Sequence, residues 1–220
     1  MTLLATNNGN YAAACALDFS VPPLYYDTFA LRDSSGAPTV SMTWPYFHSS
    51  RSRSDLTASG DVLVKSCWNG MVAFDAAPFY PTSTSPGLKF RGLPDSLAQS
   101  HLEASECCLI HMDNKLSAEK GVYLNPNVRV TYNADAYKAV HPENGQWPTQ
   151  WQKVTGVWKN RCLRWLQWPG RYLERRLVQG RIDSWIRKPS GKGGHRNSEV
   201  GGICTVDEMQ VLVSNGWKHL

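Results

Sequence analysis

Three segments of this chain place charged, aromatic and sulfur-bearing side chains inside otherwise apolar sequence. They span residues 25–33, 66–70 and 105–114. An unpaired carboxylate or guanidinium is costly to bury, so core strands rarely contain these residue types unless the groups serve a purpose. The three segments therefore predict one shared polar site.

The third segment offers an imidazole and a carboxylate, from His111 and Asp113. The apolar residues before them include the β-branched Ile110, so we expect residues 106–113 to form a strand. Side chains alternate along a strand, which would place His111 and Asp113 on one face. Such a pair suits Mn²⁺ or Mg²⁺, and a structural, hydrogen-bonded histidine is the alternative.

The second segment contains Trp68, Asn69 and Gly70. An indole packs against the C–H face of a sugar, an amide recognises hydroxyl groups, and glycine permits close approach of the backbone. These residues predict a carbohydrate-binding turn. A buried tryptophan in an ordinary turn is the alternative.

The first segment carries Asp27, Arg32 and Asp33. Asp27 could accept hydrogen bonds from sugar hydroxyls, and Arg32 could contact a phosphate or hold Asp33. The alternative is an ion-pair network that only fixes a loop. Further along, Arg129 lies in a strand-like run and could pair with a carboxylate or a diphosphate, or face solvent.

These segments also carry a family resemblance, together with the runs at residues 12–19, 90–96, 124–130 and 206–212. The chain resembles the second half of the fungal capsule-associated α-1,3-mannosyltransferases, which are Golgi enzymes that use GDP-mannose. The resemblance spans nearly the whole chain, thinly over residues 141–200. We therefore expect a C-terminal portion of such an enzyme, preceded in the family by an N-terminal membrane anchor and a nucleotide-binding half with an acidic metal motif.

The resemblance implies a retaining transferase of the Golgi lumen, with GDP-mannose as donor, a mannose-containing glycan as acceptor and Mn²⁺ (or Mg²⁺) as cofactor. In a retaining reaction, a carboxylate can stabilise oxocarbenium-like charge or orient the acceptor. We assign this role to Glu106, with Asp27 as its competitor. The expected substrate contacts are Arg32, Asp33, Trp68, Asn69, Gly70 and Arg129, and the expected metal ligands are His111 and Asp113.

A basic and aromatic segment supports a different class of function. Residues 159–196 contain eleven Lys or Arg against two acidic residues, whereas the whole chain carries a net charge of +5. Basic residues interleaved with aromatic ones can bind anionic membrane surfaces, so a non-catalytic membrane-binding module is the alternative function. A surface helix that packs its apolar stripe on its own domain is the simpler interpretation. No nucleic-acid-binding signature accompanies the segment.

The elements that position these residues predict an α/β fold. Residues 11–19, 62–65 and 71–74 are typical of strands, residues 33–36 of a turn, and residues 49–60 of a mobile loop. The resemblance implies part of an A-type glycosyltransferase fold, with a mixed sheet flanked by helices, over residues 1–145. A helical, basic region, residues 146–220, should pack on it.

Several helices are also predicted. One should begin at Pro94-Asp95 with Asp95 as N-cap and give way to the strand near Glu106. Apolar residues recur at helical spacing from Trp151 to Trp165, and a second helix should follow the break at Pro169. A capping box of Thr205 and Glu208 predicts a last helix that ends near residue 216.

The six cysteines follow no zinc-binding spacing. A lumenal setting would permit disulfides, and buried free thiols are the alternative. The chain has no apolar run long enough to span a bilayer and no signal peptide at its start. It also lacks the nucleophile elbow of hydrolases, the phosphate-binding loop and the zinc-protease motif.

Overall fold

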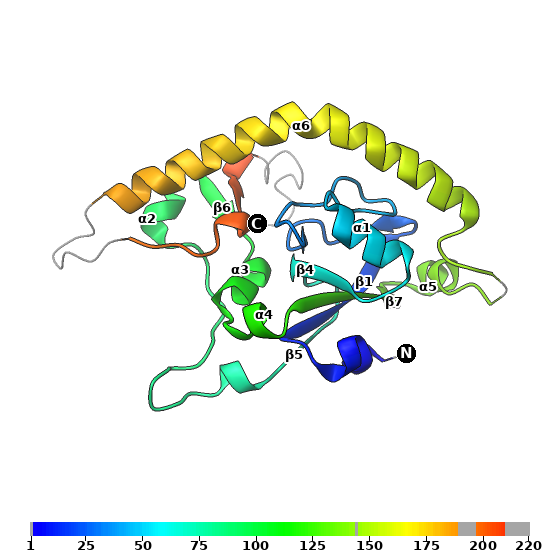
Figure 1. Cartoon of the computed structure of the whole chain (residues 1–220), viewed down its shortest axis with the longest axis horizontal. Helices are drawn as coiled ribbons and strands as arrows, with labels where there is room; N and C mark the ends of the chain where they lie inside the picture. Colours follow the sequence, from blue (N-terminus) through cyan, green and yellow to red (C-terminus); the bar gives the residue numbers. More distant parts are fainter. Residues whose placement is uncertain (1, 144, 189–196, 210–220) are drawn as a thin grey trace.

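The computed structural model describes residues 2–143, 145–188 and 197–209. A curled, mixed sheet lies beneath one long helix, α6, which arches across the top of the molecule (Figure 1). The strands of the sheet are β1 (Ala13–Val21), β2 (Leu24–Tyr25), β3 (Arg32–Asp33), β4 (Val62–Ser66), β5 (Val72–Phe74) and β7 (Val122–Thr131). The prediction of a mixed α/β fold is confirmed.

Strand β1 is the centre of this sheet. It pairs in parallel with β7 on one side and antiparallel with β5 and β2 on the other. The order continues from β7 through β4 to β3. Because both faces of β1 are covered, its residues from Ala13 to Phe19 are buried, which explains the unbroken apolar run that predicted this strand.

The helices surround the sheet unevenly. They are α1 (Ser50–Thr57), α2 (Asp95–Ala98), α3 (Glu106–Asp113), α4 (Leu116–Glu119), α5 (Ala134–Val140) and α6 (Gln150–Arg187), with 3-10 segments η1 (Leu3–Gly9), η2 (Ala77–Phe79) and η4 (Gly202–Cys204). A second sheet pairs β6 (Leu102–Ala104) with β8 (Thr205–Asp207). No described helix is both long and apolar enough to cross a membrane.

Two disulfides tie the structure together. Cys15–Cys67 joins β1 to the segment after β4 inside the main core, and Cys108–Cys204 joins α3 to the C-terminal segment. The second bond closes over a sequence separation of 96 residues. Cys107 and Cys162 are free. The chain thus adopts the disulfide alternative at two pairs and leaves two thiols.

The predicted strand over residues 106–113 is wrong, because these residues form α3. The prediction for the residues before α3 is wrong as well, since Leu102–Ala104 is a strand where a helix was expected to continue. An apolar run of this length satisfies either structure, and α3 is buried around Cys108–His111, so no amphipathic pattern marked it. The helix expected at Pro94-Asp95 is the short α2, with Pro94, not Asp95, at the N-cap.

Among the other local predictions, the strands are confirmed and a loop and a helix start are wrong. The strands at residues 11–19, 62–65 and 71–74 are confirmed as β1, β4 and β5. The supposed mobile loop at residues 49–60 contains α1 instead, because Ser49 caps it by accepting from the Ser52 amide. Thr205 lies in β8 and does not begin a helix, whereas residues 208–209 are helical, so the predicted helix begins later than its capping box implied. The remainder of that predicted helix, from residue 210, lies outside the described residues.

The expected break at Pro169 does not occur, and α6 runs unbroken from Gln150 to Arg187. Pro169 is exposed, and Figure 1 shows α6 as an arch over the sheet. A helix that is convex toward solvent already lengthens its outer hydrogen bonds, so the carbonyl that loses its partner there can be hydrated. The apolar stripe predicted to pack inward, with Trp151, Trp158 and Trp165, is exposed.

Candidate functional site

Two carboxylates, from Asp18 on β1 and Asp27 after β2, lie together at the end of the sheet. The Asp27 amide donates to Asp18 Oδ1 at 3.3 Å, and Tyr26 N–H bonds to the Asp18 carbonyl at 3.1 Å. Asp18 is 1% exposed, whereas Asp27 is partly exposed. The pair therefore has a buried member and a member that a ligand can reach.

The turn between β4 and β5 holds Asp27 in place. Asn69 N–H donates to Asp27 Oδ2 at 3.0 Å, and Ala30 N–H donates to Asp27 Oδ1 at 3.1 Å. Asn69 and Gly70 both adopt positive φ angles, 57° and 71°. A Cβ at Gly70 would lie 2.8 Å from Val130 and 3.0 Å from Asp18, so only glycine allows the turn to approach the carboxylate.

Tyrosines complete the polar cluster. The Tyr132 hydroxyl donates to Asp18 Oδ2 at 3.1 Å, and the buried Tyr25 hydroxyl donates to Asn69 Oδ1. Tyr26 packs edge-on against Tyr132 at the exposed rim. Among the described residues, none accepts a hydrogen bond from Asn69 Nδ2, although this atom is buried. The cluster therefore contains an unused amide donor.

Burial raises the pKa of Asp18 to about 6, and the neighbouring Asp27 charge adds to the rise. Hydrogen bonds from the Asp27 amide and the Tyr132 hydroxyl oppose it, because they favour the ionised form. Burial and the Asp18 charge raise the pKa of Tyr132 to about 12. A buried carboxyl group whose pKa is raised toward neutrality is typical of functional sites.

Glu106 is the first residue of α3 and is exposed. Burial, together with the charges of Asp27 and Glu106, raises the pKa of the neighbouring Cys107 to about 11. That Glu106 and Asp27 serve one site stays a prediction. Trp68 precedes Asn69 in the turn and packs edge-on against Phe90.

Arg32 and Asp33 are structural in this arrangement. Arg32 is 2% exposed and donates to the carbonyls of Ile203, Phe29 and Leu31 at 2.6–3.0 Å. Asp33 accepts from the amides of Ser35, Ala37 and Ser49 and from the Ser35 hydroxyl. Neither makes an ion pair within the described residues. The expected charge network is therefore replaced by hydrogen bonds to the backbone.

Arg129 lies away from the two carboxylates. It is in register with Leu17 on β1, whereas Asp18 is in register with Val130, so Arg129 occupies the opposite face of the sheet. Its guanidinium lies 5.1 Å from the Trp147 ring centroid, and burial lowers its pKa. The structure thus brings together Asp27, Trp68, Asn69 and Gly70, and places Arg129 elsewhere.

His111 and Asp113 do not share a face, because α3 replaces the predicted strand. His111 is fully buried and donates from Nε2 to the Cys67 carbonyl at 2.7 Å. Burial lowers its pKa to about 4, so it is neutral near pH 7. Asp113 forms a two-pronged ion pair with Arg91 at 2.6 and 2.9 Å. As placed, these two residues do not fit a shared metal ion.

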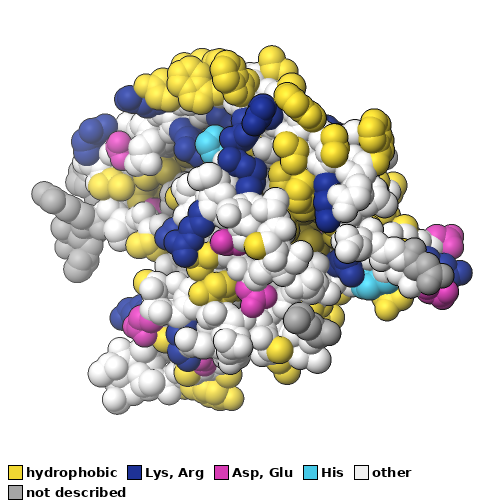
Figure 2. Space-filling model, turned by 45° about the vertical axis from the view of Figure 1, so that its right-hand side comes forward, with side chains coloured by type: hydrophobic (Ala, Val, Ile, Leu, Met, Phe, Trp, Pro, Cys, Tyr) yellow, Lys and Arg dark blue, Asp and Glu magenta, His cyan; other side chains and the backbone are white. Residues whose placement is uncertain are grey.

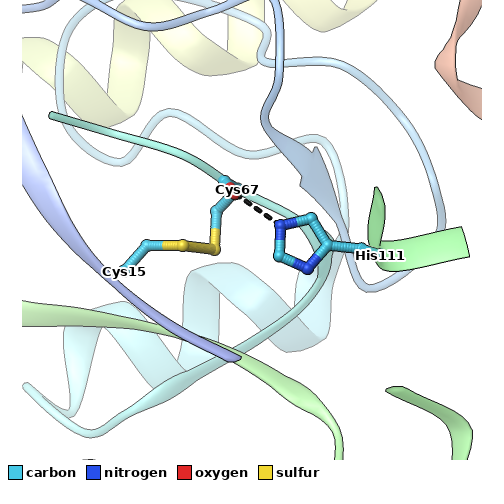
Figure 3. Close-up of side chains that lie close together, drawn as sticks. All are labelled: Cys15, Cys67 and His111. Atoms are coloured by element: carbon cyan, nitrogen blue, oxygen red, sulfur yellow. Dashed lines mark hydrogen bonds between the residues drawn. A yellow bond between two sulfur atoms is a disulfide. The ribbon is translucent and has the colours of Figure 1, made fainter. Parts of the chain in front are cut away.

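His111 does lie beside two sulfurs, those of Cys15 and Cys67. Figure 3 shows the imidazole directed at the Cys67 carbonyl with the disulfide next to it. The three potential ligand atoms lie within 4.8 Å of one another. Because the sulfurs are bonded to each other, neither is a thiolate, and the group is a structural contact of the core.

Sequence reasoning missed Asp18 and Tyr132. Asp18 was read only as part of a buried strand, yet it is the one charged residue between Ala12 and Phe19, and that isolation was the available signal. Tyr132 had no such signal, because its role depends on the parallel pairing of β7 with β1. Together the cluster can accept hydrogen bonds from hydroxyl groups and can stabilise nearby positive charge.

Comparisons with known proteins give one match. The chain matches neither a curated protein nor a solved structure. The family model described as Cryptococcal mannosyltransferase 1 matches residues 1–113. That span includes Asp18, Asp27, the Asn69 turn and Glu106, whereas Tyr132 lies outside it. The expectation from the sequence is confirmed, and the chain belongs to the Cryptococcal mannosyltransferase 1 family.

Proposed function

We propose that this chain takes part in a retaining transfer of mannose from GDP-mannose to a hydroxyl group of a mannose-containing glycan, in α-1,3 linkage. The observation that supports this most directly is the partly exposed Asp27 carboxylate, fixed beside Asp18 within the span that the mannosyltransferase family model matches. Golgi residence and the A-type fold belong to the same proposal.

In this reaction, the bond between mannose C1 and the diphosphate oxygen breaks and its electron pair leaves with GDP. The acceptor oxygen bonds to C1 from the same face, and its proton passes to the departing phosphate. Positive charge develops at C1 meanwhile. The Asp27 side chain, held by two backbone amides, would stabilise that charge without needing to reorganise.

The remaining groups suit acceptor binding. Trp68, the residue before Asn69, is partly exposed and offers an aromatic surface for a pyranose ring. Asn69 is buried, and its backbone amide positions Asp27. Glu106, at the exposed start of α3, would orient the acceptor hydroxyl. We assign no step to Arg32, Asp33 or Arg129, whose contacts are described above.

A divalent cation would help the diphosphate leave when it is bound. His111 and Asp113 do not fit that role as they are placed, so we assign no residue of this chain to the metal. The dependence on Mn²⁺ or Mg²⁺ stays a prediction.

The test is transfer from GDP-mannose to a mannose-containing oligosaccharide, with linkage analysis of the product. Asp27→Asn should lower the rate by about 10²-fold or more, because an isosteric amide cannot stabilise developing positive charge. Glu106→Gln should give a smaller loss. Matched controls are Asp135→Asn and Glu119→Gln, both exposed residues on other helices. Turnover that is equal in Asp27→Asn and wild type would contradict the proposal.

A further inference from the structure

The outward face of α6 carries a stripe of exposed aromatic side chains. Trp151, Trp158, Trp165 and Tyr172 recur at intervals of seven residues and are 75%, 59%, 82% and 48% exposed. A helix drifts by only about 20° over seven residues, so the four rings share one side. Figure 2 shows hydrophobic side chains along the top of the molecule, over this helix.

This stripe is not the side of α6 that packs on the core, because the opposite side makes the contacts with the protein body. A Cβ at Gly156 would lie 2.0 Å from the Trp44 carbonyl oxygen, and Asn160 Nδ2 donates to Phe47 O at 3.2 Å. Further along, Ile182 and Trp185 are buried against Leu97 and Leu102 of the second core. The inner face of α6 therefore packs against the protein body, and its outer face is exposed to solvent.

Cations gather along one flank of the stripe. The positive charges of Arg164, Arg171 and Arg175 on α6 lower the pKa of His48, in addition to the effect of its burial. Arg164 likewise lowers the pKa of Arg53 on α1, and Arg175 that of Arg171. Arg171 is held toward the protein body, where it donates to the carbonyls of Pro38 and Thr39, whereas Arg175 is exposed. Cations concentrated in this way provide a favourable site for an anion.

The same flank borders a hollow of about 620 Å³ between α6, the segment after β3 and the C-terminal segment. Arg171, Arg175 and Arg176 line it together with Glu174, Glu199 and apolar residues such as Ile182. Arg161 and Arg176 also lie over the rings of Trp158 and Tyr172, at 5.2 Å from each centroid. Basic and aromatic groups are therefore interleaved at the surface, and phosphate-sized groups have room beside them.

Acidic residues are absent from the part of α6 that carries the stripe. Between Gln150 and Leu173 the sequence contains neither Asp nor Glu, and the first carboxylate of the helix is Glu174. A second copy of this chain would therefore bring arginines against arginines. Indole rings beside arginine and lysine, on a helix without long apolar runs, match the composition of helices that lie in the membrane interface.

We propose that the outer face of α6 binds an anionic membrane surface, with Trp151, Trp158 and Trp165 at the level of the headgroups and the exposed Arg161, Arg175 and Arg176 against lipid phosphates. This proposal does not depend on the transferase activity. The binding surface lies along a solvent-facing helix, whereas the carboxylate cluster lies at the end of the central sheet.

The test is flotation of the whole 220-residue chain with vesicles of phosphatidylcholine alone or with added phosphatidylserine. We expect affinity to be at least about tenfold higher for the anionic vesicles and to fall with added salt, because surface cations attract anionic lipid. Brominated lipids should quench tryptophan fluorescence. Equal binding to both vesicles, or none to either, would overturn the proposal.

Variants distinguish binding through the outer face of α6 from non-specific adsorption to lipid. Trp158→Ser/Trp165→Ser should weaken vesicle binding about tenfold, since each indole contributes interfacial burial. The matched control, Tyr80→Ser/Tyr137→Ser, removes two exposed aromatic residues outside α6 and should bind normally. Arg161→Gln/Arg175→Gln should reduce the preference for phosphatidylserine, whereas Lys65→Gln/Lys89→Gln should not. Circular dichroism confirms that each variant is folded, and binding that persists without the two tryptophans would contradict the proposal.

Two further arms distinguish other occupants. Inorganic phosphate at matched ionic strength should not displace the protein from vesicles, and full displacement would instead indicate a site for free anions. Light scattering should show a monomer in the absence of lipid. A dimer that Trp158→Ser/Trp165→Ser disperses would show that a second copy covers the stripe.

Discussion

The carboxylate cluster buries a charged side chain, whereas α6 exposes large aromatic side chains, and both arrangements are unusual in a globular protein. At the end of the sheet, Asp18 is buried and its ionised form is held by two hydrogen bonds. Along α6, Trp165 is 82% exposed, although the opposite side of the helix packs against the protein body. A buried charge with partners indicates chemistry at a fixed point, whereas an exposed apolar row indicates association over a surface. The two regions therefore suggest separate tasks within one chain.

The Cys108–Cys204 bond, which joins α3 to the C-terminal segment, gives the largest expected effect. Cys108→Ala/Cys204→Ala should lower the free energy of unfolding by about 4 kcal/mol, because the cross-link spans 96 residues and restricts the unfolded chain. Urea unfolding under non-reducing conditions measures the change. The control is Cys162→Ala, which removes an exposed free thiol and should leave the midpoint unchanged. Equal stability of the double variant and wild type would mean that the Cys108–Cys204 bond does not stabilise the fold.

The buried charge of Asp18 predicts a pH dependence. Its pKa is raised from 3.8 to about 6, so the folded state holds the proton more tightly than the unfolded chain. The contribution of Asp18 to the free energy of unfolding should therefore be fully present below pH 3.8 and be lost, by about 3 kcal/mol in total, as pH rises through 6. Asp18→Asn should remove this fall, and Asp135→Asn should retain it. Urea titrations between pH 4 and 7 measure the difference, and an unchanged fall in Asp18→Asn would contradict the assignment.

The seating of α6 depends on its closest approach to the body. Gly156→Ala should destabilise the protein by about 2 kcal/mol, because the new methyl would lie 2.0 Å from a backbone oxygen. Gly170→Ala is the matched change on the same helix, where nothing lies within 4 Å. It should stabilise by about 0.5–1 kcal/mol through helix propensity. Chemical unfolding compares the two, and effects of the same sign would argue against this packing.

The elements that could be predicted from the sequence are those whose pattern allows one interpretation. β1, β4 and β5 are short, apolar and bounded by Pro or Gly, and all three are confirmed. Residues 106–113 allowed two interpretations, and the structure adopts the helical one. For α6, periodicity indicated a stripe but could not tell which side faces the body. That choice depends on Gly156 meeting Trp44, a contact between distant residues.

The candidate site was predictable to a similar extent. Asp27, Trp68, Asn69 and Gly70 lie in marked segments, and the structure brings them together. Asp18 and Tyr132 meet only through the pairing of β1 with β7, which local sequence does not specify. The pairing of His111 with Asp113 depended entirely on a strand, so it was lost when α3 formed. Roles that rest on tertiary pairing were therefore the ones that sequence could not supply.

The central claim is that the cluster around Asp27 is a site for a mannosyl substrate. The most direct test is calorimetric titration of the monodisperse chain with GDP-mannose and, separately, with a mannose-containing oligosaccharide, each with and without Mn²⁺ and with UDP-glucose as control. We predict saturable, mannose-selective binding that Asp27→Asn weakens and Asp135→Asn does not. Absence of selective binding by well-folded protein, or equal affinity in Asp27→Asn, would contradict the claim.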